Sequence, residues 1–228
     1  MDPDVGVVLV AAGAGTRFGG PKAFVELEGR SLLERSAEPF EGFPDRVVVV
    51  RDEDRPLIRL PGWRVVAGGA RRRDSVKAGL EALAPTTRFV LIHDAARPLA
   101  SRDLVARVAA AARSGVAVVP ALPVTDTIKR VVGARVLSTP DRAELVRVQT
   151  PQGFSVALLA RALAASDRDA SDEAGLVEGL GEEVRILSGE PRNIKVTTPL
   201  DLEIARALLR TPLADSSVIM GGPGETAG

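Results

Sequence analysis

The feature that most constrains the fold of this chain is a series of short apolar runs, rich in β-branched residues, in its first half. The runs are mostly continuous rather than alternating, which is typical of strands buried on both faces of a sheet. Segments with helical spacing of apolar residues lie between them. Alternating strands and helices predict a three-layer α/β fold with a mainly parallel sheet. The predicted strands are Val5–Val10, Arg46–Val50, Arg64–Ala67, Phe89–Ile92 and Val116–Val119.

Capping residues mark several of the predicted helices. Ser31 and Glu34 have the spacing of a capping box, and Ser101 precedes another helical segment. Thr198 followed by Pro199 is typical of a cap followed by a proline in the first turn, which predicts a helix from Pro199 to Arg210. Further helices are predicted at residues 74–84, 155–165 and about 172–179.

The length of 228 residues is suited to one domain, which we expect to span residues 1–210. The remaining segment, 211–228, is rich in Gly, Ser and Pro, and we expect it to be a disordered tail.

The segment from about 122 to 150 departs from the alternating pattern. It has short β-branched runs separated by the sequences VGAR and STPDRAE, and no strong helical period. This pattern predicts a β-arm of two or three strands. Such an arm is too small to bury its own apolar face, so we expect it to pack on another subunit.

Composition excludes several classes of function. A formal net charge of zero argues against a nucleic-acid partner, and the absence of cysteine excludes disulfides, thiol nucleophiles and cysteine-ligated metals. No apolar stretch approaches the roughly 20 residues of a membrane span. The acidic start MDPD does not resemble a signal peptide. We therefore expect a soluble cytoplasmic protein that binds neither nucleic acid nor membrane.

A glycine-rich segment, AAGAGTRFGGPKAF at residues 11–24, follows the first predicted strand. It does not match a dinucleotide-binding fingerprint, because Phe18 stands where the third glycine is needed. It does not match a Walker A loop either, because Pro21 interrupts the motif and Ala23 replaces the required Ser or Thr. A chain that fails the fingerprint is a weak candidate for an NAD-dependent oxidoreductase.

A third interpretation of this segment is a different nucleotide loop. Ala11, Ala12 and Gly13 have so little side chain that a nucleotide can lie against their backbone. Arg17 and Lys22 can then flank a triphosphate. The alternative is an ordinary glycine-rich turn that carries surface cations.

Three later segments point to the same edge of the predicted sheet. GGARRRDSV (68–76) is a second glycine turn, in which Ser75 can cap a helix or bind a base or ribose. The arginine triplet of this segment is interpreted as a solvated turn.

HDAARP (93–98) places Asp94 and Arg97 at the carboxyl end of a strand, where open parallel sheets bind ligands. Asp94 is a candidate ligand of metal or substrate. The single histidine, His93, is interpreted as satisfied by its neighbours. Lys195 lies in a short strand-like run, NIKVT (193–197).

In order along the chain, these segments resemble the motifs of the 2-C-methyl-D-erythritol 4-phosphate cytidylyltransferase family. The motifs are LVAAGAGTRFGGPKAF, AGGARRRDSV, LIHDAARP, VTDTIKR, RVQTPQGF, SDEAG and NIKVTTPLD, and they extend from about residue 5 to 205. The resemblance implies a Rossmann-like nucleotidyltransferase fold and a homodimer joined through a β-arm. It also implies that CTP and methylerythritol phosphate react with Mg²⁺ to give CDP-methylerythritol and pyrophosphate.

The resemblance also implies roles for individual residues. The backbone of Ala11, Ala12 and Gly13, completed by Gly68, Gly69 and Ser75, should hold cytidine. Arg17 and Lys22 should stabilise the triphosphate in the transition state. The substrate sugar phosphate should be held by Asp94, Arg97, Thr127, Arg142, Thr150 and Lys195, with Asp94 also a metal ligand and Arg142 acting in the partner's site. Of these, Arg17, Lys22, Arg142 and Lys195 are the candidate catalytic residues.

Three positions depart from the family's usual pattern. Ala70 replaces an acidic residue after the second glycine turn, VRV replaces an aromatic stretch before QTPQ, and SDEAG begins with Ser171 and ends with Gly175. Two other functions are kept as alternatives. One is a cytidylyltransferase for another sugar or alditol phosphate, and the other is a non-catalytic nucleotide-binding module.

Overall fold

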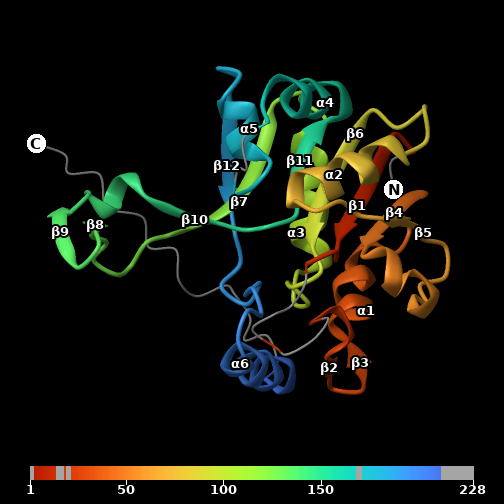
Figure 1. Cartoon of the computed structure of the whole chain (residues 1–228), viewed down its shortest axis with the longest axis horizontal. Coiled ribbons are helices and arrows are strands. Elements are labelled where there is room, and N and C mark those ends of the chain that lie inside the picture. The colour runs from red at the N-terminus through yellow and green to blue at the C-terminus, as the bar shows by residue number, and fades with distance from the viewer. Residues whose placement is uncertain (1–2, 14–17, 19–21, 168–170, 212–228) are drawn as a thin grey trace, which may run out of the picture.

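A computed structural model describes residues 3–13, 18, 22–167 and 171–211. The described chain forms a body built on one large sheet, from which an arm projects to one side (Figure 1). The strand order is β10-β7-β11-β6-β1-β4-β5, with β12 paired to the free side of β7. The bounds are β1 (Val5–Val10), β4 (Asp45–Val50), β5 (Arg64–Ala67), β6 (Phe89–Asp94), β7 (Ala117–Pro123), β10 (Val146–Val148), β11 (Gln152–Ser155) and β12 (Val184–Ser188).

Most of the sheet is parallel, as predicted. β1 lies between β4 and β6 and runs parallel to both, and β5 continues the parallel set beyond β4. β11 is antiparallel to β6 and β7, so it reverses direction between two strands that point the same way. The carboxyl ends of β1, β4 and β6 therefore meet at one edge of the sheet.

Helices cover both faces of the sheet, and the side chains of β1 alternate between them. Val5 and Val7 pack with residues of α3, whereas Val8 packs with residues of α2, α4 and α5. This arrangement confirms the predicted three-layer α/β fold. The α-helices are α1 (Leu32–Ala37), α2 (Arg72–Glu81), α3 (Arg102–Ala112), α4 (Val156–Ala165), α5 (Ala174–Glu178) and α6 (Pro199–Arg210). A small hairpin, β2 (Glu26–Leu27) with β3 (Arg30–Ser31), precedes α1, and 3-10 turns cover Lys22–Phe24, Glu38–Phe40, Asp52–Leu57 and Arg142–Glu144.

Three predicted helix starts are confirmed. Ser31 accepts a hydrogen bond from the amide of Glu34, whose carboxylate bonds back to Ser31, so the capping box is complete. Ser101 caps α3, and Thr198 caps α6 with Pro199 in its first turn. The predicted helix at 74–84 begins two residues earlier, at Arg72, because Arg71 and Asp74 form a cap there.

Two parts of the sheet differ from the sequence-based prediction. β12 was not predicted, because its side chains are largely exposed and its place depends on pairing with β7 rather than on burial. The run NIKVT was expected to be a strand, and this was wrong: residues 193–197 form no ladder. The amide of Val196 bonds to the carbonyl of Ala96, and the side chains of Lys22 and Arg97 bond to carbonyls of this segment.

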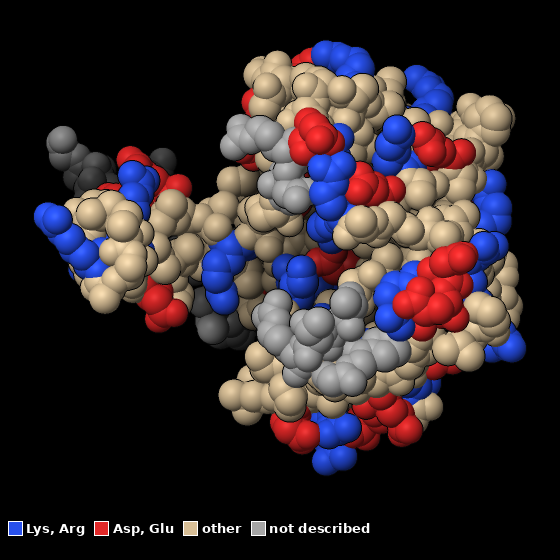
Figure 2. All heavy atoms as spheres, in the orientation of Figure 1, with Lys and Arg blue, Asp and Glu red and all other residues tan. Residues whose placement is uncertain are grey.

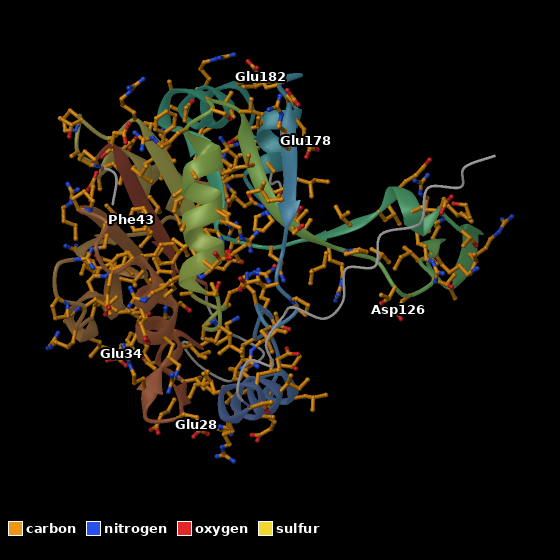
Figure 3. The ribbon with its side chains drawn as sticks, turned by 180° about the vertical axis from the view of Figure 1, so that it is seen from behind. Glu28, Glu34, Phe43, Asp126, Glu178 and Glu182 are labelled. Carbon is orange, nitrogen blue, oxygen red and sulfur yellow. The ribbon has the colours of Figure 1, made fainter. Side chains whose placement is uncertain are left out.

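The predicted arm is present. β8 (Arg130–Val132) and β9 (Arg135–Ser138) pair with each other at its far end, while β10 joins the main sheet through β7. Figure 3 shows the labelled Asp126 on this arm, well away from the body. Several large apolar side chains of the arm are exposed: Ile128, Val131, Val132, Val136, Leu137 and Val146.

None of the helices in the described residues is both long and apolar enough to cross a membrane. The predicted tail at 211–228 lies, apart from Thr211, outside the described residues.

Candidate active site

A cavity of about 170 Å³ opens at the carboxyl ends of β1 and β6. The two strands end in register, with Val10 opposite Asp94, and the chain leaves both in the same direction. On the face seen in Figure 2, acidic and basic side chains lie close together around a hollow near the centre of the body. The described residues that line the cavity are Val10, Ala11, Gly13, Lys22, Ala23, Asp94, Ala95, Ala96 and Lys195. This is the edge at which open parallel sheets bind ligands.

Asp94 is the carboxylate of this cavity, and both of its oxygens contact cations. Oδ2 accepts a hydrogen bond from Lys195 Nζ at 2.7 Å, and Oδ1 accepts one from Arg72. Burial alone would raise the pKa of Asp94, but the charges of Arg72 and Lys195 outweigh it and hold that pKa well below its usual range. Asp94 is therefore ionised at neutral pH.

Arg72 continues the network away from the cavity. Its second terminal nitrogen contacts Glu173 Oε2 at 2.7 Å, and Glu173 is almost fully buried. Burial raises the pKa of Glu173, and Arg72 opposes that shift. The result is a row of alternating charge in the order Lys195, Asp94, Arg72 and Glu173. The prediction of a solvated arginine turn was wrong for Arg72.

Lys22 brings the glycine-rich segment to the cavity. It begins a single 3-10 turn, and its Nζ donates a hydrogen bond of 2.6 Å to the carbonyl of Val196, next to Lys195. Two lysines from opposite ends of the chain thus line one cavity. Arg17, the other candidate cation of this loop, lies outside the described residues.

The second glycine turn packs directly against the first. A Cβ atom added to Gly68 would lie 2.6 Å from Ala12 Cβ and 2.6 Å from Ser75 Oγ, so only glycine fits there. Ser75 is buried, and its hydroxyl contacts the carbonyl of Arg71 at 3.2 Å. Gly69 is adjacent, against Asp74. Ala12, Gly68 and Ser75 therefore lie together beside Ala11 in the cavity wall.

Behind the cavity, His93 and Thr150 form a buried hydrogen-bonded chain. The Thr150 hydroxyl accepts from the amide of Asp94 and lies 3.1 Å from His93 Nδ1, while His93 Nε2 lies 3.2 Å from the carbonyl of Arg97. The Arg97 guanidinium donates to the carbonyls of Asn193 and Val148. These contacts connect the end of β6 to the two segments beside it. They agree with the expectation that His93 is satisfied by its neighbours.

The remaining candidates, Thr127 and Arg142, belong to the arm. Thr127 is exposed, and Arg142 donates a hydrogen bond of 2.9 Å to the carbonyl of Thr125. Arg142 lines a second hollow, between the arm and β12. Neither residue is among the described residues that line the cavity at Asp94.

Sequence reasoning missed Arg72 and Glu173 as members of the site. Both lie inside motifs that were recognised, AGGARRRDSV and SDEAG, but no role was given to either. The local sequence holds no sign that these two segments, about 100 residues apart, meet through an Arg72–Glu173 contact beside Asp94. An arginine triplet beside a glycine turn was the one available signal.

The family model of 2-C-methyl-D-erythritol 4-phosphate cytidylyltransferase matches residues 5–211. The chain belongs to this family. It is 54% identical over 216 residues to the family's enzyme from Rhodococcus jostii, covering 89% of this chain and 94% of that one. The enzyme of the same name from Nocardia farcinica is 47% identical over 220 residues, covering 91% and 95%.

Solved structures of cytidylyltransferases agree with this assignment. The crystal structure of the family's enzyme from Thermus thermophilus has a TM-score of 0.77 and 40% identity, covering 90% of this chain and 98% of that one. The 4-diphosphocytidyl-2C-methyl-D-erythritol synthase of Anaerococcus prevotii has a TM-score of 0.80 and 31% identity, covering 91% and 98%. The fold is therefore that of this family of nucleotidyltransferases.

Proposed function

We propose that this chain transfers CMP from CTP to 2-C-methyl-D-erythritol 4-phosphate. The products are 4-diphosphocytidyl-2-C-methyl-D-erythritol and pyrophosphate, in the non-mevalonate route to isoprenoid precursors. The family match over residues 5–211 carries the proposal. The cavity supports it, because two lysines and a paired carboxylate at the end of a parallel sheet suit phosphate chemistry.

In this reaction, an ionised oxygen of the sugar phosphate attacks the α-phosphorus of CTP. A new P–O bond forms, and the bond to the leaving pyrophosphate breaks on the opposite side. The attacking oxygen already carries negative charge near neutral pH, so the reaction needs neither a protein nucleophile nor a general base. The position of His93 fits a reaction that needs no histidine base, because both of its ring nitrogens lie at hydrogen-bonding distance from buried protein groups.

The protein's task is to bring two polyanions together and to offset the charge that builds on the phosphates. Lys22 and Lys195 line the cavity where those phosphates would lie. Arg17 would add a third cation. The backbone of Ala11, Ala12 and Gly13 would bind the nucleotide, and the glycine turn at Gly68 and Gly69, with Ser75, would complete the cytidine pocket.

Mg²⁺ fits this site as a partner of the nucleotide rather than as an ion held by the protein alone. The described residues contain no cluster of three or more acidic, histidine or cysteine side chains that could hold a metal. Asp94 is ionised and lines the cavity, and Mg²⁺ commonly binds one or two carboxylates together with substrate phosphates. Asp94 would hold the ion, which would supply charge neutralisation on the triphosphate.

The β-arm would join two chains into a homodimer. Its exposed apolar side chains cannot be covered by an arm of this size, and Val132 alone is 67% exposed. Thr127 and Arg142 would then meet methylerythritol phosphate through the dimer, Arg142 in the partner's site. Lys195 of the same chain would complete the substrate pocket at the cavity wall, and Arg97 and Thr150 would complete it from behind that wall. A cytoplasmic location and the absence of a nucleic-acid partner stay predictions from the sequence.

Pyrophosphate release tests the function directly. CTP and Mg²⁺ would be supplied with methylerythritol 4-phosphate, and ribitol 5-phosphate and erythritol 4-phosphate would be run in parallel, as would GTP and ATP in place of CTP. We expect release only with CTP and methylerythritol 4-phosphate. Release with another sugar phosphate would support a related cytidylyltransferase, and CTP binding without any release would support the non-catalytic module.

A further inference from the structure

We propose that Arg72 and Glu173 are positioning residues for the transfer reaction. Together they hold the Asp94 carboxylate so that one of its oxygens faces Lys195 and the cavity. This inference rests on the proposed function, since it assigns a task to two residues that act on the reactants through Asp94 and Lys195. Neither Arg72 nor Glu173 is among the described residues that line the cavity.

The contact geometry of Arg72 is that of a clamp between two carboxylates. One terminal nitrogen bonds to Asp94 Oδ1, and the other bonds to Glu173 Oε2 at 2.7 Å. A guanidinium is planar and rigid, so two carboxylates bound to its two ends are fixed relative to each other. Fixing Glu173 therefore fixes the orientation of Asp94.

Glu173 is a suitable anchor because its own position is fixed by the fold. It is the N-cap residue of α5, and its backbone carbonyl accepts hydrogen bonds from the amides of Leu176 and Val177. Its side chain is only 2% exposed. Arg72 is the first residue of α2, and Asp94 is the last residue of β6. The contacts of Arg72 thus hold the end of β6, which forms the cavity wall, in a fixed position relative to α2 and α5.

The two cations that contact Asp94 differ in exposure. The Lys195 side chain is 45% exposed and lines the cavity, whereas the Arg72 side chain is 27% exposed and points to two buried carboxylates. Of these two cations, Lys195 is the one found among the described residues that line the cavity where a phosphate would enter. Arg72 remains as the fixed partner of Asp94 when Lys195 contacts substrate.

Arg72 also makes an incomplete set of hydrogen bonds, which a purely structural ion pair would not favour. Its Nε is buried and has no hydrogen-bond partner among the described residues. A buried donor without a partner costs stability. Both carboxylates therefore have a hydrogen-bond partner while one donor of the arginine has none. This is expected if the function of Arg72 is to hold Asp94 in position.

The test uses two conservative variants and a matched control pair. Arg72→Lys keeps the charge but removes the fork, and Glu173→Gln keeps the shape but removes the anchor's charge. Arg161 and Glu182 form another arginine–glutamate pair, also at 2.7 Å, with both side chains exposed. Glu182 lies just before β12, at the opposite end of the body from α6 (Figures 1 and 3). Arg161→Lys and Glu182→Gln are therefore the controls.

We expect both Arg72→Lys and Glu173→Gln to lower kcat/KM for the sugar phosphate by about 10- to 100-fold, the size of effect that a displacement of about 1 Å produces. The Kd for CTP, measured by titration calorimetry without Mg²⁺ so that an ion held by Asp94 does not contribute, should stay within about twofold of wild type. The two control variants should match wild type in both measurements.

A double variant, Arg72→Met with Glu173→Leu, separates positioning from stability. Replacing both charges of a buried pair by apolar side chains commonly preserves stability, whereas removing one does not. We expect its urea midpoint to lie above that of Arg72→Met alone, and its kcat/KM to stay as low. Recovery of kcat/KM together with the midpoint would overturn the positioning role, as would variants that equal the controls. Wild-type protein that releases no pyrophosphate would refute the proposed function itself, and the positioning role with it.

Discussion

His93 allows a direct test of the hydrogen-bonded chain behind the cavity, because it is the single histidine of the protein and its titration can be followed alone. Nε2 faces the carbonyl of Arg97, which can only accept a hydrogen bond, so Nε2 must carry the proton. Nδ1 then accepts from the Thr150 hydroxyl. The imidazole is neutral and held in one tautomer, and a second proton on Nδ1 would displace the hydrogen bond from Thr150.

The size of the expected change in stability follows from the pKa of this imidazole. Burial lowers the pKa of His93 from 6.5 to about 4. Between these values the unfolded chain binds a proton that the folded chain does not. His93 therefore contributes its full stability above pH 6.5 and loses it as the pH falls toward 4. Two and a half pH units correspond to about 3 kcal/mol, a large part of the 5–15 kcal/mol that stabilises a typical protein.

Two measurements check this prediction. NMR of histidine-labelled protein in metal-free buffer should show one imidazole in the Nε2–H form that stays neutral at pH 5. Urea unfolding between pH 4 and 7 should show the stability difference between wild type and His93→Gln shrinking by about 3 kcal/mol as the pH falls. An imidazole that titrates above pH 6, or that carries its proton on Nδ1, would refute the reasoning.

Four further predictions concern other parts of the molecule. Lys22→Ala should lower kcat by on the order of 10², since it removes a cation from the phosphate site. Asp201→Asn should destabilise the protein by about 1 kcal/mol at pH 7 in urea unfolding, because it weakens the cap of α6. Hydrogen bonds, chiefly from Thr197, lower the pKa of Asp201 to about 2, so this difference should persist above pH 4 and fade as the pH falls toward 2. Phe154→Ala, in the fully buried centre of the core, should cost about 3–5 kcal/mol in the same assay. Val132→Asp should shift the protein from dimer to monomer in light scattering.

Three of these predictions have a control or a contradicting result. Lys77→Ala removes an exposed helix lysine paired with Glu81, and turnover should not change. Equal turnover in Lys22→Ala and Lys77→Ala would remove Lys22 from the phosphate site. An Asp201→Asn protein whose deficit is unchanged at pH 2 would exclude the carboxylate charge as its cause. A monomeric wild-type protein would contradict the role proposed for the arm.

Local signals in the sequence predicted much of this structure because their physical causes are local. A Ser31–Glu34 box, or a threonine before Pro199, satisfies the amides of its own first turn and needs nothing from the rest of the chain. The continuous apolar runs predicted β1, β4 and β6 because a strand buried on both faces must be apolar throughout. Strand β12 escaped prediction because pairing at a sheet edge leaves no such pattern.

The residues of the candidate site also divide into those that the sequence could predict and those that it could not. Its glycine turns and the lysines Lys22 and Lys195 could be proposed from motifs, because backbone freedom and charge are properties of the residues themselves. The charge network around Asp94 could not, since Arg72, Glu173 and Lys195 come from segments that only the tertiary structure brings together. The strength of an ion pair depends on the distance between the charges and on how far water is excluded around them, and neither can be read from the sequence. The sequence by itself thus determined the strands β1, β4, β5, β6 and β7, the helix caps at Ser31, Ser101 and Thr198, and the class of chemistry. The packing of α2 and α5 against the end of β6 decided which charges act together.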